Sequence, residues 1–419
     1  MRVIAGFSLA AALLLATALA APPAFDPVLD ADPFAAEALL AHPARHDPAT
    51  RHYLQGVVAA ARLDTVAATN ALAAVYRDRQ APPALAARAL ALAGTTEARA
   101  EHYDVAADLL DRAISEHGSD LPPAQLSEAR ETRDGAMAMR GAPAQSVERA
   151  LPGHLDLSAN ALGLTTAPVT IEGQAQVAVI DTGSDISALS ATAAKRFGLT
   201  VIARDTVTRT ATTSIASHMA IADTVQFGTI TLHHVAFLVL DDAALSPLGP
   251  ANRIDAIIGL PVLAALGRVT FRDAGGKRSL DFTPSARTTH PGNLRFAGYK
   301  PFVLVSANGQ TLPFAIDSGS NTTYFGKRYA REFPERLAGL AHRMGTTIGG
   351  GGAEKRDSAV IPKLDTAVGG THVMLSDVKI ELEGSGADDL YGTIGADLLW
   401  AKGGYTTDFG KLSLTLGPD

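Results

Sequence analysis

The chain has 419 residues, of which 47% are hydrophobic and 19% are charged, a composition typical of a folded globular protein. Its length indicates roughly two or three domains. The formal net charge is −7 and the sequence has no block of basic residues. We therefore expect no nucleic acid as a partner, because a phosphate-binding surface needs clustered Lys and Arg. The lack of cysteine excludes disulfide bonds and a lipid attached to an N-terminal cysteine.

Residues 1–20 have the features of a secretory signal peptide. Arg2 gives a positive start, residues 3–19 are apolar, and Ala18-Leu19-Ala20 fits a small-x-small cleavage site. An uncleaved anchor is the alternative, because an apolar run of about 17 residues is close to the length that spans a bilayer. The alanine-rich composition favours cleavage, and no other sequence segment is long and apolar enough to span. We therefore expect a periplasmic or secreted protein with no stable membrane span after cleavage.

Residues 28–140 are rich in Ala, Leu and Arg and show the periodicity of helices. A recurring helix pair here resembles tetratricopeptide-type hairpins, whose small residues permit close helix approach. An irregular, alanine-rich helical bundle is the alternative. A domain of this kind could bind a protein partner. The recurring residues are 38 positions apart: Leu54, Gly56, Ala68 and Leu72 match Leu92, Gly94, Ala106 and Leu110.

Residues 141–154, which begin with Gly-Ala-Pro, form a predicted linker, and the composition changes after it. Residues 169–180 and 302–316 are β-rich, and each segment has a glycine, Gly173 or Gly309, where a hairpin would turn. Asn308-Gly309 is a strong signal for a two-residue hairpin turn. In both segments the second strand runs directly into an acidic residue.

Each of these strands ends in the motif Asp-[Thr/Ser]-Gly-Ser. The motif occupies residues 181–184 and 317–320. Two copies in a chain of average composition are expected by chance about once in ten thousand cases. The two acids are 136 residues apart, and the same spacing separates Gly173 from Gly309 and Gly259 from Gly395. The sequence therefore contains a duplication that supplies one carboxylate per copy.

The paired motifs, each followed 78 residues later by the glycine of an apolar-apolar-Gly run, resemble the aspartic proteases of the pepsin and retropepsin type. The resemblance covers about residues 155–419. It implies a bilobal all-β acid-protease fold made of two retropepsin-like repeats, residues 155–290 with Asp181 and residues 291–419 with Asp317. With all-α helical hairpins in front, the chain is predicted to be an α+β multidomain protein.

The resemblance implies that Asp181 and Asp317 are the catalytic residues. Two carboxylates that face each other at short range cannot both ionise, so they share a proton. The ionised one can take a proton from a water while the protonated one hydrogen-bonds the scissile carbonyl, which requires no metal, no cofactor and no covalent intermediate. Gly183 and Gly319 permit unusual dihedrals and close backbone approach in the two turns. The alternative is that both acids are structural turn residues in a decayed enzyme.

Four hydroxyl side chains are implied to support this pair. By resemblance, Thr182 and Ser318 hydrogen-bond across the axis between the lobes and lock the two turns. Ser184 and Ser320 would contact the outer carboxylate oxygens. Ordinary turn chemistry is the alternative explanation for each of them.

Two hairpins are expected to close over the site. Residues 206–222 have the position and the β-branched content of a first flap. Residues 346–353 are the glycine-rich counterpart, which we expect to be mobile. The first flap has no aromatic residue, although the flaps of the family's larger lobes often carry a Tyr. This difference favours a retropepsin-like clamp that uses both flaps.

Together these features predict an exported aspartic endopeptidase that acts on peptides or unfolded proteins. One alternative is a non-enzymatic peptide-binding protein that keeps the cleft without cutting. The other is a zymogen in which residues 28–150 are a removable inhibitor, and Arg62, Arg77 and Arg79 leave that alternative open. Prosegments of pepsin-type enzymes are, however, far shorter than this stretch.

Overall fold

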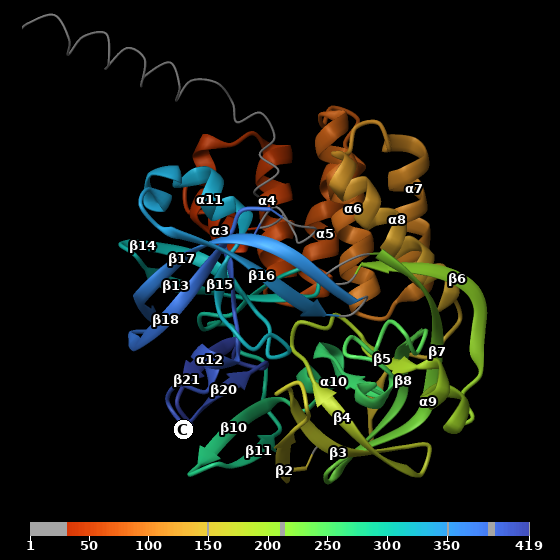
Figure 1. The fold of residues 1–419 in the computed structure, drawn as a ribbon. Coiled ribbons are helices and arrows are strands. Elements are labelled where there is room, and N and C mark those ends of the chain that lie inside the picture. Colours follow the sequence, from red (N-terminus) through yellow and green to blue (C-terminus); the bar gives the residue numbers. More distant parts are fainter. Residues whose placement is uncertain (1–31, 149–150, 210–213, 350–351, 384–389, 419) are drawn as a thin grey trace, which may run out of the picture.

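The computed structural model describes residues 32–148, 151–209, 214–349, 352–383 and 390–418, so the predicted signal peptide lies outside the described residues. The helices of residues 33–138 lie along one side of two β lobes (Figure 1). The predicted α+β multidomain class, with an all-α part followed by a bilobal β part, is confirmed. Within the described ranges, no helix combines the length and the apolar character that crossing a membrane requires.

Apart from the helix Tyr103–His117, the helices of residues 33–138 begin at acidic caps or at prolines. Asp47 and Asp64 cap α4 (Pro48–Ala61) and α5 (Thr65–Tyr76), and each carboxylate accepts a backbone N–H at 3.0 Å. Proline, whose missing N–H has no partner at a helix start, opens α6 (Pro83–Arg99) and α8 (Pro123–Ala138). The same region contains α3 (Pro33–Leu40) and α7 (Tyr103–His117).

The recurring glycines of the helical region lie where two helices cross. α4 packs against α5, and α6 packs against α7. A Cβ on Gly56 would lie 2.5 Å from Cγ of Leu72, and a Cβ on Gly94 would lie 2.5 Å from Cγ of Leu110. The sequence repeat therefore corresponds to two helix hairpins with the same close contact, which is consistent with the tetratricopeptide-like prediction.

The first lobe is a sheet that curls around an apolar core, and its β3–β4 hairpin turns at Glu172 and Gly173, both with positive φ. Positive φ at both central residues is the geometry that suits the twist of the flanking strands. The lobe consists of β2 (Gly153–Ala159), β3 (Thr165–Ile171), β4 (Gln174–Ile180), β5 (Ser187–Ser190), α9 (Ala191–Arg196), β6 (Val201–Arg209), β7 (Ser214–Phe227), β8 (Ile230–Leu240), β9 (Ala256–Ile258), α10 (Leu260–Ala265), β10 (Arg268–Ala274) and β11 (Lys277–Thr283).

The second lobe repeats this plan, and its β13–β14 hairpin turns at Asn308 and Gly309 with φ of 52° and 77°. Both hairpins are therefore where their glycines predicted them. The lobe consists of β12 (Arg295–Ala297), β13 (Lys300–Ala307), β14 (Gln310–Ile316), β15 (Tyr324–Phe325), α11 (Lys327–Glu332), β16 (Ala341–Gly349), β17 (Gly352–Val368), β18 (Thr371–Glu381), β19 (Gly392–Ile394), α12 (Ala396–Leu399), β20 (Gly404–Asp408) and β21 (Ser413–Leu416).

A shared sheet joins the two lobes. Its strand order is β21-β20-β10-β11-β2, so the last two strands of the chain extend the sheet of the first lobe. Phe271 of β10 stacks on Tyr405 of β20 with ring centroids 4.4 Å apart, and the Trp400 ring meets Phe271 edge-on at 5.9 Å. In addition, β1 (Ser146–Val147), which lies in the expected linker, pairs with β8. The lobes therefore share one continuous core.

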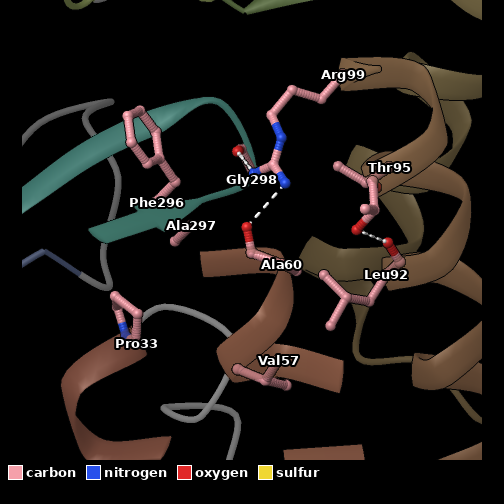
Figure 2. Close-up of a pocket in the computed structure, with 10 residues that line it drawn as sticks. Pro33, Val57, Ala60, Leu92, Thr95, Arg99, Phe296, Ala297 and Gly298 are labelled. Atoms are coloured by element: carbon pink, nitrogen blue, oxygen red, sulfur yellow. Dashed lines mark hydrogen bonds between the residues drawn. The ribbon is translucent and has the colours of Figure 1, made fainter. Parts of the chain in front are cut away.

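The helical region contacts the second lobe through buried charges. Arg295 is only 7% exposed, and its Nε lies 2.5 Å from Oε1 of Glu37 in α3. At the end of α6, Arg99 donates to the carbonyl oxygens of Gly298 and Ala60, at 2.8 Å each (Figure 2). The two hydrogen bonds of Arg99 border a cavity of about 20 Å³, room for about one water molecule.

The helical region also contacts the first lobe. Met139, which follows α8, is 1% exposed and packs in a small apolar cluster with Met219 of β7. α8 itself packs beside β6. The helices are thus packed into the β part through both lobes and are not tethered to it by a linker alone.

Candidate active site

Two equivalent strands deliver the two acids. Asp181 follows β4, which pairs in parallel with β9, and Asp317 follows β14, which pairs in parallel with β19. The backbone N–H of Asp181 donates to the carbonyl of Ile258 at 3.1 Å, and that of Asp317 donates to the carbonyl of Ile394 at 3.0 Å. The duplicated motif in the sequence is therefore also a duplicated structure.

A glycine packs behind each acidic turn. A Cβ on Gly259 or on Gly395 would lie within 2.8 Å of backbone atoms of the turn in front of it. The N–H of Gly259 donates to the hydroxyl of Ser187 at 3.1 Å, and that of Gly395 donates to the hydroxyl of Thr323 at 3.0 Å. Only a residue without a side chain permits this approach, so the apolar-apolar-Gly runs serve to support the turns.

Thr182 and Ser318 lock the two turns together. The backbone N–H of Ser318 donates to Oγ1 of Thr182 at 2.9 Å, and the N–H of Thr182 donates to Oγ of Ser318 at 2.9 Å. The hydroxyls then donate across the axis, from Thr182 to the carbonyl of Ile316 at 3.4 Å and from Ser318 to the carbonyl of Ile180 at 3.2 Å. Both side chains are buried, and their arrangement is the one that the resemblance implied.

Gly183 and Gly319 bring each turn against the acid of the other lobe. A Cβ on Gly183 would lie 2.5 Å from Cγ of Asp317, and a Cβ on Gly319 would lie 2.7 Å from Cγ of Asp181. Each glycine N–H donates to Oδ1 of the acid in its own turn, at 2.8 Å and 2.9 Å. Neither residue has a positive φ. The positive φ that glycine permits is therefore not used in these turns, and close approach is the property that requires glycine here.

The hydroxyls of Ser184 and Ser320 donate to the backbone, and not to the carboxylate oxygens that the resemblance implied. The hydroxyl of Ser184 donates to the carbonyl of Ile186 at 2.8 Å, and that of Ser320 donates to the carbonyl of Thr322 at 3.0 Å. Each hydroxyl has a single proton and uses it on the backbone two residues later. These serines shape the turns in this structure, which is the ordinary turn chemistry that was the alternative.

The two carboxyl groups are hydrogen-bonded to each other and titrate as a pair. Burial and the adjacent charge of Asp317 hold the pKa of Asp181 well above its usual range. Burial also raises the pKa of Asp317, while its hydrogen bonds to Asp181 and to the N–H groups of Gly319 and Ser320 oppose the rise. The two carboxyl groups therefore share one proton, with one group protonated while the other is ionised.

Two charged neighbours, one from each lobe, also shift the pKa values of the two acids. The positive charge of Lys300, at the start of β13, lowers the pKa of Asp317, whereas the negative charge of Asp185 raises the pKa of Asp181. The pattern in the sequence could have indicated Asp185, because Asp185 takes the place of Asn321 in the otherwise matching motif. No sequence signal marks Lys300, which comes near the pair only through the fold.

Tyr405 is a further residue that sequence reasoning missed. Its ring is 1% exposed, burial raises the pKa of its hydroxyl, and that hydroxyl hydrogen-bonds Ser318. Tyr405 therefore holds Ser318, one of the two residues that lock the turns together. Its strand, β20, crosses into the sheet of the first lobe, a pairing that no local pattern indicates.

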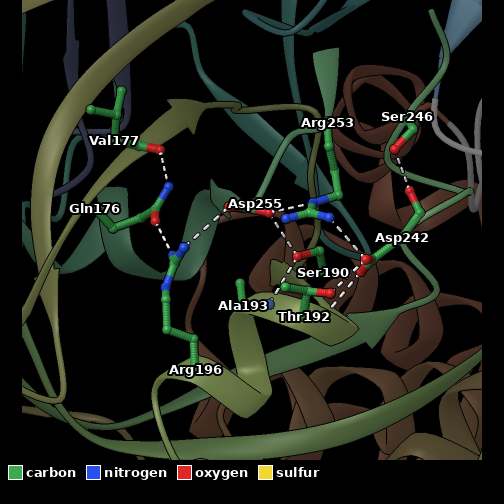
Figure 3. A network of polar contacts seen from close by, with 10 residues as sticks. All are labelled: Gln176, Val177, Ser190, Thr192, Ala193, Arg196, Asp242, Ser246, Arg253 and Asp255. Carbon is green, nitrogen blue, oxygen red and sulfur yellow. Dashed lines mark hydrogen bonds and ion pairs between the residues drawn. The ribbon is translucent and has the colours of Figure 1, made fainter. Parts of the chain in front are cut away.

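A polar network on the first lobe holds β9 in place (Figure 3). This strand leads into Gly259, which packs behind the Asp181 turn. Asp255, directly before β9, accepts hydrogen bonds from Ser190 at 2.9 Å and from Arg253 at 2.7 Å. Arg253 also pairs with Asp242 at 3.0 Å, and Asp242 accepts the N–H and hydroxyl of Thr192 at 3.0 Å and 2.6 Å. These bonds connect β5, α9 and β9, and so hold the frame behind the turn.

The two predicted flaps are long hairpins. β6 and β7 form the first, whose tip, residues 210–213, lies outside the described residues. β16 and β17 form the second, whose tip, residues 350–351, lies outside them as well. The outer strands β6 and β16 are the free edges of their sheets.

Across the described ranges, no three His, Asp or Glu side chains gather in a way that could hold a metal ion. Residues 167–262 match the family model for aspartyl proteases. Among solved structures, the chain is similar to the crystal structure of a retropepsin-like aspartic protease from Rickettsia conorii, with 16% identity over 34% of this chain and 98% of that chain and a TM-score of 0.24. No curated protein matches the chain.

The match lies within the first lobe, and it includes the Asp181 turn and the supporting run at Gly259. The second lobe repeats the same turn and the same support. The part of the first lobe that holds the Asp181 turn is thus similar to the aspartyl proteases.

Proposed function

We propose that this protein is an aspartic endopeptidase, in which Asp181 and Asp317 hydrolyse peptide bonds with an activated water. The observation that carries the proposal is the pair of hydrogen-bonded carboxyl groups, held face to face by the reciprocal bonds of Thr182 and Ser318. If each acid only stabilised its own turn, a second acid beside it would serve no purpose, because the charge of Asp317 raises the pKa of Asp181.

In the proposed reaction we take Asp317 as the ionised partner, and it removes a proton from a water as the water oxygen attacks the carbonyl carbon. Asp181 gives its proton to the carbonyl oxygen, which yields a neutral tetrahedral diol. The C–N bond then breaks while Asp317 returns its proton to the leaving amine. Asp181 recovers a proton from a hydroxyl of the diol as the new carboxyl group forms. Atoms and protons balance, and the carboxyl pair ends as it began.

The test is the rate of cleavage of one peptide over a pH series, with and without EDTA, and then with a statine-type inhibitor. The mechanism needs one protonated and one ionised carboxyl group, so we expect a bell-shaped profile with its maximum below neutral pH. EDTA should leave the rate unchanged, and the inhibitor should abolish it. Inhibition by EDTA, or a rate that still rises above about pH 9, would contradict the carboxylate mechanism.

We also propose that the protein is exported. The support is the sequence of residues 1–20, with Arg2, the apolar run and the Ala18-Leu19-Ala20 site. Fractionation of cells should place the mature chain outside the cytoplasm, and N-terminal sequencing should begin at Ala21. A mature chain that still begins at residue 1 would contradict signal cleavage.

The zymogen alternative gains no support from Arg62 and Arg77, two of the three arginines that left it open. Arg62 pairs with Glu37 inside the helical region at 3.0 Å, and the guanidinium of Arg77 lies over the Tyr76 ring at 5.7 Å. Both are therefore engaged by neighbours on the helices. The peptide-binder alternative predicts binding without turnover, which the same pH series tests.

A further inference from the structure

The pseudo-twofold arrangement gives the site two ends, and they differ. At one end, Asn321 follows the second acidic turn, and its amide donates to the carbonyl of Leu162 in the first lobe at 3.1 Å. A Cβ on Gly163 would lie 3.7 Å from Oδ1 of Asn321. In the described residues, this side-chain bond joins one lobe directly to the other, without the helical region.

At the other end, Asp185 takes the place of Asn321, and Gly298 takes the place of Leu162, each 136 residues away. A carboxylate cannot donate to a carbonyl. The carbonyl of Gly298 instead accepts a hydrogen bond from Arg99 of α6 at 2.8 Å. The helical region thus replaces the lobe-to-lobe bond (Figure 2).

The helical region contacts this end on its other sides as well. Ile186, next to Asp185 in the first acidic turn, packs in the same apolar cluster as Tyr103 of α7 and Met139. That cluster also includes Met219 of the first flap. Across the gap, a Cβ on Gly298 would lie 3.7 Å from Oε1 of Glu128 in α8. Helical residues therefore touch the turn, the flap and the opposite lobe around one end of the site.

Electrostatics agree with this placement. Burial raises the pKa of Asp185, the charge of Lys300 opposes the rise, and the negative charge of Glu131 in α8 adds to it. Asp185 therefore lies within the electrostatic reach of both Lys300 and Glu131 of α8.

We propose that the helical region closes the substrate cleft at its Asp185 end, so that the enzyme cuts peptide bonds close to one terminus of the substrate. This inference rests on the proposed peptidase function. An extended peptide advances about 3.3 Å per residue, and the helical region packs with Ile186, directly beside the Asp181 turn. The closed end therefore leaves room for a few substrate residues on that side, whereas the Asn321 end admits a longer chain.

The experiment uses the full-length mature protein and two peptide series with one scissile sequence. One series is lengthened on the amino side and the other on the carboxyl side, from about two to about ten residues, which spans roughly 7 to 33 Å. We expect kcat/KM to fall by at least about tenfold with length in one series only. Equal tolerance of length in both series would overturn the proposal.

A variant of α8 tests whether this helix forms the closed end of the cleft. Glu131→Ala shortens a side chain of α8 near Asp185, and we expect the ratio of long-peptide to short-peptide kcat/KM to rise by about threefold or more. The matched control is Glu116→Ala at the end of α7, where Glu116 is 51% exposed and pairs with Arg112. The control should leave the ratio unchanged. A length limit that Glu131→Ala does not relax would place the closed end elsewhere and overturn the role of the helical region.

The outcomes separate the two levels of the proposal. If the wild-type protein cuts no peptide of either series at any pH, the proposed function fails. If it cuts peptides of all lengths, and Asp181→Asn does not, the function stands and the closed cleft fails. The wild-type series decides the matter even if a variant does not fold.

Discussion

The two β lobes present the same acidic turn but hold their flaps by different means. At the base of the first flap, the hydroxyls of Thr206 and Ser217 are 2.8 Å apart, and Met139 of the helical region packs on Met219. The second flap is held by charges of its own lobe. There Arg356, 5% exposed, pairs with Glu381 at 2.6 Å and with Glu354 at 2.8 Å.

The difference shows which parts of the duplication are constrained. The strand ends, the turn glycines and the hydroxyl lock occur in both lobes, because the two carboxyl groups must face each other. The supports outside that frame have diverged. The first flap depends on the helices, so changes in the helical region should reach the site mainly through the first lobe.

The largest expected effect concerns the two acidic turns, which are the same in both lobes. Asp181→Asn and Asp317→Asn should each lower kcat by more than about 10²-fold, because each removes half of one acid–base unit. The double variant should be little worse than either single one, since residues that act as a unit are not additive. Single-turnover rates on one peptide measure this. Near-normal cleavage by either single variant would refute the pair.

The equal parts of the lobes are also the parts that the sequence predicts. Both hairpin turns are local, since a Gly with positive φ such as Gly173 or Gly309 suffices to place them. The acids and the glycine runs repeat at a fixed spacing, so the duplication is visible without structure. The contacts of Ser184 and Ser320 were predicted wrongly, because the choice between a carboxylate and a nearby carbonyl depends on small rotations of a turn.

The second prediction concerns the two flaps, which the two lobes hold by different contacts. Met139→Ala should lower the free energy of unfolding by about 2 kcal/mol, at the low end for a buried Met because its apolar cluster is small. The matched change on the second flap is Met344→Ala, where Met344 is 68% exposed. It should cost less than about 0.5 kcal/mol. Urea unfolding of both variants measures the contrast, and equal losses would contradict the dependence of the first flap on the helices.

The third prediction concerns the stability cost of the pair. The folded-state pKa of Asp181 lies above its unfolded value, so the folded protein binds more protons and loses stability as the pH rises above about 4. Asn carries no such penalty. Asp181→Asn should therefore unfold at higher urea than the wild type at pH 7, and the difference should vanish near pH 3. A variant less stable than the wild type at pH 7 would contradict the direction of the shift.

Features that depend on contacts between distant segments could not be predicted. Tyr405 supports Ser318 because β20 joins a sheet of the other lobe, and Arg99 reaches Gly298 across 199 residues of sequence. Composition and periodicity describe helices and strands one at a time. They do not say which helix end will pack against which turn, and so they left the role of the helical region undecided.

The smallest expected effect separates the two ends of the site. The charge of Asp185 raises the pKa of Asp181, so Asp185→Asn should lower that pKa. The catalytic acid would then lose its proton at lower pH, and the alkaline limb of the pH profile should move down. Asn321→Asp places a negative charge at the equivalent position of the other lobe and should move the limb up. Asn321→Ala is the control for the lost bond to Leu162. Rates at the optimum should change by less than about tenfold. Shifts of the same sign in both variants would mean that the pair responds to altered packing and not to the charge beside each turn.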